Sequence, residues 1–305
     1  MVTVAVEPAT RPEMHSAFVA AVREAGATVG LLAEAEALIW ADPQRSDLYP
    51  ELIGAAPRVR WIQLPYAGIE PFVDYLDARF VWTCGKGVYA PPVAEHALAL
   101  ALAGLRGIDT YARADRWLEP IGRNLLGARV LILGGGGIAL SLVDLLEPFG
   151  CAITVFRHHD APIERTRVIT ERSQLDAALP DADVVVIALS LTDRTRGIVD
   201  AAFLSRMAAH AWLVNVGRGG HVVTDDLVAA LLEQRIGGAA LDVTDPEPLP
   251  QGHRLWSIPN CIITPHIANT PEMGLPLIAA RVQDNVARFV AGEPLVGLVD
   301  VAAGY

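Results

Sequence analysis

Apolar positions along the first third of the chain follow two spacings, and these spacings predict alternating strands and helices. Short, nearly unbroken apolar runs are typical of buried strands, whereas apolar residues three or four apart are typical of amphipathic helices. Proline at the start of a run favours a helix start. We therefore expect strands at 2–6, 37–41, 59–65 and 80–84, and helices at 13–26 and from Pro91 onward.

A second series of strand patterns begins after residue 127 and is separated by helical patterns. Four of its runs are nearly continuous in apolar residues, as parallel strands buried on both faces require. Alternation of such strands with helices predicts βαβ crossovers and hence a doubly wound sheet. The expected strands are 128–134, 152–156, 183–189, 211–217, 238–243 and 261–265, and a last helix covers 273–292.

The two series predict an α/β protein with two Rossmann-like domains, each a doubly wound parallel sheet. We expect a substrate-binding domain from residues 1–96 and 271–305, and a dinucleotide-binding domain from residues 97–270. An active-site cleft is expected between the two domains, and the last helix is expected to return to the first one.

Composition narrows the class of protein. The net charge of −11 comes without a basic run, which argues against nucleic-acid binding. The longest apolar stretches, such as 97–105, are too short to span a bilayer, and the N-terminus lacks the features of a signal peptide. The three cysteines match no metal spacing. We expect a cytoplasmic protein without a metal site and without nucleic-acid or membrane partners.

A glycine-rich turn between a strand and a helix is the first candidate site. In RVLILGGGGIALSLVDLLEPFG (129–150), Gly134, Gly136 and Ala139 fill the three places of G-x-G-x-x-G/A. The amides of Gly136, Gly137 and Ile138 then face a pyrophosphate at a helix N-terminus. The alternative is a turn with a purely structural role, which the strand–turn–helix context disfavours.

The residue after the next strand distinguishes two cofactors. Arg157 stands where a carboxylate usually holds the ribose of NAD, and a guanidinium there suits the 2′-phosphate of NADP. His158, His159 and either Arg165 or Arg167 are expected as further donors to that phosphate. We therefore expect NADP, with NAD and a solvated Arg157 as the alternative.

Three later strands are each followed by a polar residue of catalytic type. Arg218 follows one strand, the carboxylates Asp242, Asp245 and Glu247 follow the next, and His266 follows the last. An arginine can hold a substrate carboxylate, and a histidine can give a proton to a carbonyl oxygen. Each of these residues, taken alone, has a purely structural explanation. Their joint occurrence at strand ends favours an enzyme that reduces a 2-oxo acid.

Five short segments carry a family resemblance. They are VAEH (93–96), LSLTDRTRG (189–197), NVGRG (215–219), DVTDPEPLP (242–250) and TPH (264–266). With these motifs the whole chain resembles the D-isomer-specific 2-hydroxyacid dehydrogenases. Two of the segments depart from the family pattern, with Ser190 in place of proline and Thr244 in place of an aromatic residue.

The resemblance implies a role for each residue at a matching position. Arg218 is the implied substrate anchor, His266 the acid/base and Glu247 its partner. Asp242 is implied to meet the nicotinamide carboxamide, and Leu189 is implied to be a cofactor-binding residue. The loop IQLPYAGIE (62–70) corresponds to one whose backbone amides, here at Ala67 and Gly68, bind the substrate carboxylate.

One segment of the first domain departs from the family pattern. CGKGVY (84–89) falls where the family often has N-x-x-G-V-N, so Cys84 and Tyr89 replace two asparagines, and Lys86 lies between them. The run GGHVVTDDLVAAL (219–231) and the end at Gly304-Tyr305 are most similar to the short glyoxylate and hydroxypyruvate reductases. A homodimer is expected from the same resemblance.

Together these features predict an enzyme that transfers a hydride from NADPH to a small 2-oxo acid such as glyoxylate or hydroxypyruvate. One alternative is an NAD-dependent dehydrogenase of a bulkier or phosphorylated D-2-hydroxy acid. The other, different in kind, is a dinucleotide-sensing binding protein with the same fold.

Overall fold

The computed structural model describes residues 1–301, which divide into two compact units. Unit 1 contains Met1–Tyr89 and the described residues from Thr270 onward, and unit 2 contains Ala90–Asn269. We expected the division at residues 96/97, inside α3 (Ala90–Leu105). The whole of α3 instead belongs to unit 2, because it packs along α5 (Gly137–Leu146) and β10 (Trp212–Asn215).

The structures of the two units leave several expectations untested. The binding roles of the two domains and the cleft between them stay predictions, as does the cytoplasmic location. The chain end at Gly304-Tyr305 lies outside the described residues. Among residues 1–301, no helix has the length and apolar character to span a bilayer, and no cluster of side chains has the make-up of a metal site.

Unit 1 is built on a parallel sheet with the order β2-β1-β3-β4-β5, which is the flavodoxin-like winding. One face is covered by α1 (Pro12–Glu24) and α9 (Pro271–Ala291), which contact each other, and the other by α2 (Tyr49–Gly54) and neighbouring loops. The last helix therefore returns to the first domain, as expected. The strands are Thr3–Glu7, Thr28–Val29, Ala37–Trp40, Trp61–Gln63 and Val81–Thr83.

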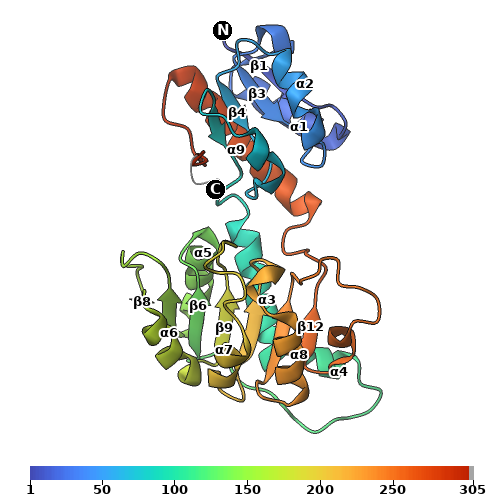
Figure 1. Cartoon of the computed structure of the whole chain (residues 1–305), viewed down its shortest axis with the longest axis vertical. Coiled ribbons are helices and arrows are strands. Elements are labelled where there is room, and N and C mark those ends of the chain that lie inside the picture. The colour runs from blue at the N-terminus through green and yellow to red at the C-terminus, as the bar shows by residue number, and fades with distance from the viewer. Residues whose placement is uncertain (302–305) are drawn as a thin grey trace. The chain divides into compact units, whose positions relative to one another are not determined.

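Unit 2 contains a parallel sheet with the order β12-β11-β10-β9-β6-β7-β8 within the described chain (Figure 1). The chain starts at β6, winds outward to β8, and then continues from β9 on the other side of β6. This order is the doubly wound arrangement of dinucleotide-binding sheets, with its switch point between β6 and β9. The strands are Arg129–Leu133, Ala152–Phe156, Thr166–Ile169, Val184–Ile187, Trp212–Asn215, Gly238–Leu241 and Cys261–Ile263.

Helices cover both faces of this second sheet, which explains its unbroken apolar strands. In β6, Val130 and Ile132 face α3 and α5, whereas Leu131 and Leu133 face the opposite layer. That layer contains α6 (Arg172–Ala178), α7 (Ala201–Arg206) and α8 (Thr224–Leu232). The short α4 (Ile108–Ala112) follows α3. The predicted α/β fold class with two parallel sheets is confirmed.

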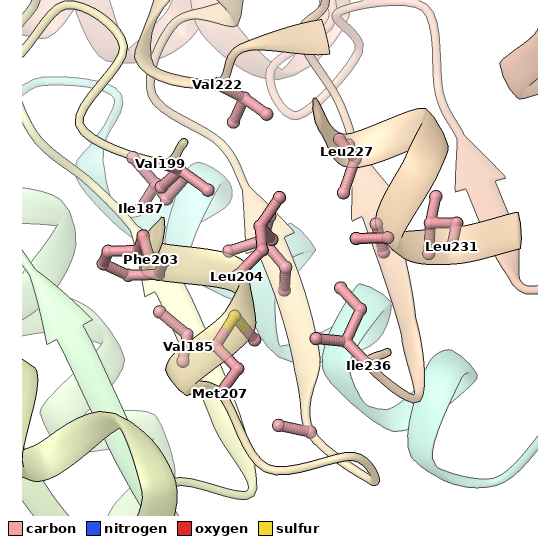
Figure 2. Packing of buried hydrophobic residues seen from close by; sticks show 14 of the residues in the cluster. Val185, Ile187, Val199, Phe203, Leu204, Met207, Val222, Leu227, Leu231 and Ile236 are labelled. Carbon is pink, nitrogen blue, oxygen red and sulfur yellow. The ribbon is translucent and has the colours of Figure 1, made fainter. Parts of the chain in front are cut away.

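The opposite layer is held to the sheet by one large apolar cluster (Figure 2). Phe203 and Leu204 of α7 are buried beside Val185 of β9, and Leu227 and Leu231 extend from α8. Each buried leucine of this kind contributes about 1.5–3 kcal/mol by leaving water. The cluster therefore fixes α7 and α8 against the strands whose ends carry the candidate site.

Leu204→Ala should lower the stability of unit 2 by about 2–5 kcal/mol, because the truncation leaves a cavity beneath α7. Leu204 is 1% exposed, whereas Leu232, at the end of α8, is 50% exposed. Leu232→Ala is thus a matched control, and it should cost less than about 0.5 kcal/mol. Calorimetric melting of both variants checks this, and equal losses would contradict the packing described here.

Candidate active site

The glycine-rich turn lies at the switch point of the unit 2 sheet and is shaped by close backbone contact. Gly134 has a φ of +113°, and a Cβ there would lie 2.4 Å from the Ala188 carbonyl oxygen. The turn is therefore pressed against the loop after β9, which carries Leu189. Only glycine combines this left-handed conformation with so close an approach.

The helix after this turn begins without a side-chain cap. Gly136 is the N-cap of α5, is exposed, and would have open space around a Cβ. Gly137 is exposed and Ile138 is half-buried, so the first amides of α5 face open space at the positive end of the helix dipole. This cradle fits a dinucleotide pyrophosphate.

Arg157 lies directly against the glycine-rich turn. A Cβ built on Gly135 would come within 2.8 Å of Cδ and 2.9 Å of Nε of Arg157. In the described part of the chain no carboxylate pairs with this guanidinium. His158, the next residue, is exposed, and its ring centroid lies 4.9 Å from that of His159. The end of β7 therefore presents a cation beside the cradle.

One of the arginines expected to assist Arg157 forms ion pairs with other residues of unit 2. Arg165, in a left-handed turn with a φ of +62°, forms ion pairs with Asp144 and with Glu147, the latter at 2.6 Å. Both acids lie at the far end of α5 and in the turn after it, away from the N-terminus of that helix. Arg165 is therefore engaged by these acids, and its role at the cofactor stays a prediction, as does that of Arg167, which is exposed in β8.

His266 and Glu247 meet at the carboxyl ends of the last two strands. Nδ1 of His266 lies 2.6 Å from Oε1 of Glu247, and both side chains are about half exposed. Asp245, the other acid before Pro-Leu-Pro, makes no such contact within residues 1–301. The carboxylate orients the ring, and Nε2 is the ring nitrogen left to contact a ligand.

The backbone of His266 is held in an uncommon conformation by Asp242. His266 has a φ of +53°, in the left-handed region, which costs about 1–3 kcal/mol for such a residue. Its N–H donates to the Asp242 carbonyl at 2.8 Å. The Asp242 carboxylate accepts from the next two amides, those of Ile267 at 2.9 Å and Ala268 at 3.1 Å.

Asp242 itself is 2% exposed and has further internal donors. Thr264 Oγ1 donates to its Oδ1 at 2.6 Å, and His96 Nε2 lies 3.4 Å from the same atom. Burial alone would raise the pKa of Asp242, but hydrogen bonds from His96, Thr264 and the two following amides lower it to about 2. Its implied contact with a nicotinamide stays a prediction, since both oxygens have protein donors.

Arg218 extends from the loop after β10, which packs on the loop that leads to Glu247. A Cβ on Gly219 would lie 1.9 Å from the Thr244 carbonyl oxygen, so these two backbones are in direct contact. Thr224 Oγ1 also donates to the Asp245 carbonyl at 2.7 Å. The chain order β10, β11, β12 is the spatial order, and Arg218, Glu247 and His266 thus follow three neighbouring strands at one edge.

In unit 1, the loop after β4 presents the backbone of Ala67 and Gly68. Gly85 N–H donates to the Tyr66 carbonyl at 2.9 Å, and the Tyr89 hydroxyl donates to the Pro65 carbonyl at 2.7 Å. These two bonds fix the loop from the 84–89 segment. Within the described chain the amides of Ala67 and Gly68 have no internal acceptor, as donors to a ligand require.

Two histidines of this region were not predicted to act at the site. His96, in the VAEH segment, reaches Thr264 Oγ1 at 3.0 Å and so joins the Asp242 network. His221, three residues after Arg218, contacts the backbone of that residue. For His96, the VAEH motif was the only signal in the sequence. His221 is distinguished by its burial, which no local sequence pattern reveals.

Comparison with known proteins agrees with this geometry. Residues 96–268, more than half of the chain, match the model of the family described as D-isomer specific 2-hydroxyacid dehydrogenase, NAD binding domain. Glyoxylate/hydroxypyruvate reductase A of Yersinia enterocolitica is 29% identical over 88% of this chain and 87% of that protein.

Two solved structures cover the chain almost completely. The D-isomer specific 2-hydroxyacid dehydrogenase of Xanthobacter autotrophicus, in complex with NADPH and MES, has a TM-score of 0.83 and 27% identity over 100% of this chain and 99% of that one. The NADPH-dependent glyoxylate/hydroxypyruvate reductase of Sinorhizobium meliloti, in complex with NADP and sulfate, has a TM-score of 0.81 and 26% identity over 100% of both chains. The expected resemblance is confirmed, and the chain belongs to the D-isomer-specific 2-hydroxyacid dehydrogenase family.

Proposed function

We propose that this protein is an NADPH-dependent reductase of small 2-oxo acids of the glyoxylate and hydroxypyruvate type. The observation that carries the proposal is the 2.6 Å contact between His266 and Glu247, at the same sheet edge as the Arg218 loop. Similarity to reductases of these acids supports the substrate class.

Each residue of the trio supplies one part of the reaction. Arg218 binds the carboxylate of the oxo acid through its planar guanidinium and draws electron density from the neighbouring carbonyl. His266 gives its Nε2 proton to the carbonyl oxygen as the carbon is reduced, and Glu247 orients the ring through its contact with Nδ1. In unit 1, the amides of Ala67 and Gly68 stay the predicted donors to the carboxylate.

The cofactor is assigned by the residues around the glycine-rich turn. Bound NADPH would supply the hydride that the carbonyl carbon receives. The α5 amides from Gly136 to Ile138 fit its pyrophosphate, Leu189 lies beside the turn, and Arg157, with His158 next to it, is proposed to bind the 2′-phosphate.

Initial rates with a panel of 2-oxo acids, each with NADPH and with NADH, test the proposal directly. We expect the highest kcat/KM for glyoxylate or hydroxypyruvate with NADPH. Preference for a bulky or phosphorylated acid with NADH would support the alternative dehydrogenase. Cofactor binding without turnover of any acid would favour a dinucleotide-sensing protein and overturn the proposal.

His266→Gln should lower kcat by about 10²–10⁴-fold while leaving the Kd for NADPH within about twofold, because the lost group acts only on the reacting oxygen. Stopped-flow rates and fluorescence titration of NADPH measure the two quantities. Glu247→Ala should also lower kcat without changing the Kd for NADPH, because the His266 ring loses the carboxylate that orients it.

His253→Gln is the matched control for His266→Gln. His253 belongs to unit 2 but sits at the start of the 3₁₀ turn Arg254–Ser257, where its ring accepts a hydrogen bond from Leu255 N–H. Its kcat should stay near that of the parent protein. Equal losses in the two variants would mean that His266 acts through stability alone.

Arg157→Gln should lower kcat/KM for NADPH by about 10–100-fold and leave that for NADH nearly unchanged. The reason is the loss of charge-assisted hydrogen bonds to the phosphate, each worth about 1.5–3 kcal/mol. Arg129→Gln, at the amino end of β6 where Asp181 pairs with it at 3.0 Å, is the control and should change neither value. An equal fall in kcat/KM for both cofactors in Arg157→Gln would contradict the phosphate-binding role.

We also propose a homodimer that buries the exposed apolar side chains of residues 108–126 in unit 2. Trp117 is 99% exposed, and Ile108, Ile121 and Leu126 are each more than half exposed. Sedimentation velocity should show a dimer that Trp117→Glu dissociates at micromolar concentration. Leu31→Glu, at a residue of unit 1 that is 74% exposed, should leave the dimer intact. A monomeric parent protein would contradict the assignment.

A further inference from the structure

A fully buried histidine lies directly behind the proposed substrate anchor. His221 ends the short 3₁₀ turn Gly219–His221 after β10 and is 0% exposed. A Cβ on Gly217 would come within 3.2 Å of its ring atoms and equally close to the Leu189 carbonyl oxygen. The imidazole therefore fills the space beneath the Arg218 loop, beside the loop after β9.

The ring contacts both backbone groups of Arg218 through one atom. Nδ1 of His221 lies 3.1 Å from the Arg218 nitrogen, whose N–H points at it, and 2.9 Å from the Arg218 carbonyl oxygen. One ring nitrogen cannot accept the first bond and donate the second at the same time. The position of the ring proton therefore decides which contact is a hydrogen bond.

The other partners of Arg218 decide the tautomer. The Arg218 carbonyl already accepts from the side chain of Asn215 at 3.0 Å and from His221 N–H at 3.2 Å. The Arg218 N–H has Nδ1 as its acceptor. With Nδ1 accepting and the proton on Nε2, the Arg218 N–H keeps its acceptor, whereas the other tautomer would leave that N–H unpaired and only add a third donor to the Arg218 carbonyl. Among the described residues Nε2 has no partner with hydrogen-bond geometry.

The surroundings of the ring favour its neutral form. Burial lowers the pKa of His221 by more than the backbone groups of Ser190 and Arg218 raise it. The charged side chains that act on the ring, Arg218 from its own loop and Arg196 from the loop after β9, are both cations. Protonation would put a donor in place of the acceptor at Nδ1.

We propose that His221 is a positioning residue for substrate recognition, whose neutral imidazole holds the Arg218 N–H and so fixes the direction in which the Arg218 side chain leaves the loop. The inference rests on the proposed function, because it takes Arg218 as the carboxylate anchor. On its other side the same loop is pressed against Thr244 through Gly219. Arg218 is thus fixed between an imidazole and a peptide carbonyl.

Two substitutions separate positioning from packing. His221→Leu keeps a side chain of similar volume but removes the acceptor. His221→Asn loses volume but carries an amide oxygen at the branch that Nδ1 occupies. We expect His221→Leu to raise KM for the oxo acid about tenfold or more, with a smaller fall in kcat because Arg218 also acts on the carbonyl, and with the Kd for NADPH within about twofold.

The asparagine variant should show the opposite pattern. We expect His221→Asn to keep KM within about threefold of the parent value although its melting temperature falls further than that of His221→Leu, because it leaves a cavity. A parent-like KM in His221→Leu, or KM losses that follow the melting temperatures of the two variants, would overturn the proposal.

Arg218→Lys, measured beside them, separates this inference from the proposed function. If Arg218→Lys raises KM strongly and His221→Leu does not, the positioning role alone fails. If Arg218→Lys leaves KM unchanged, Arg218 is no anchor and both proposals fall. The ¹⁵N resonances of the His221 ring near neutral pH give a readout without turnover. A proton on Nε2 alone is expected, and one on Nδ1 would overturn the proposal.

Discussion

The buried carboxylate of Asp242 is the constraint on which the candidate site depends. Burying a charge is costly, and only several well-placed donors offset that cost. Here two backbone amides, Thr264 and His96 supply them. The bonds from Ile267 and Ala268 to this carboxylate, with that from the His266 N–H to the Asp242 carbonyl, hold His266 in its left-handed conformation. The Asp242 carboxylate therefore both stabilises this loop and orients His266, the proposed acid, toward Glu247.

The parallel sheet explains why residues distant in sequence come together. Its strands all end at one edge, so each loop that follows a strand contributes to one surface. Direct backbone contacts then set the spacing between loops: Gly134 lies against Ala188, and Gly219 lies against Thr244. Any side chain at either glycine would separate its loop from the neighbouring one. The motif glycines thus determine distances between loops as well as the shape of turns.

Strands that are buried on both faces could be predicted from the sequence. Contacts between segments distant in sequence could not. The apolar runs of β6, β9 and β10 were predicted correctly, whereas β8 was missed, because TRVI at the sheet edge is half polar. Glu247 and His266 could be paired from their motifs. The Arg165 ion pairs and the contact of His221 depend on how turns fold back, which no local spacing encodes.

Cys84 and Tyr89, the two departures from the family pattern in unit 1, both serve the framework of that unit. Cys84 is 2% exposed, with Gly297 packed against its carbonyl, and Tyr89 donates its hydroxyl to Pro65. Where the family often has asparagines, this chain therefore gives both side chains to its own framework. Under the proposed function, polar recognition of the oxo acid relies on Arg218 and His266 in unit 2 and on the backbone amides predicted in unit 1. A guanidinium, an imidazole and amide N–H groups suit a carboxylate and a carbonyl, the two polar groups that all 2-oxo acids share.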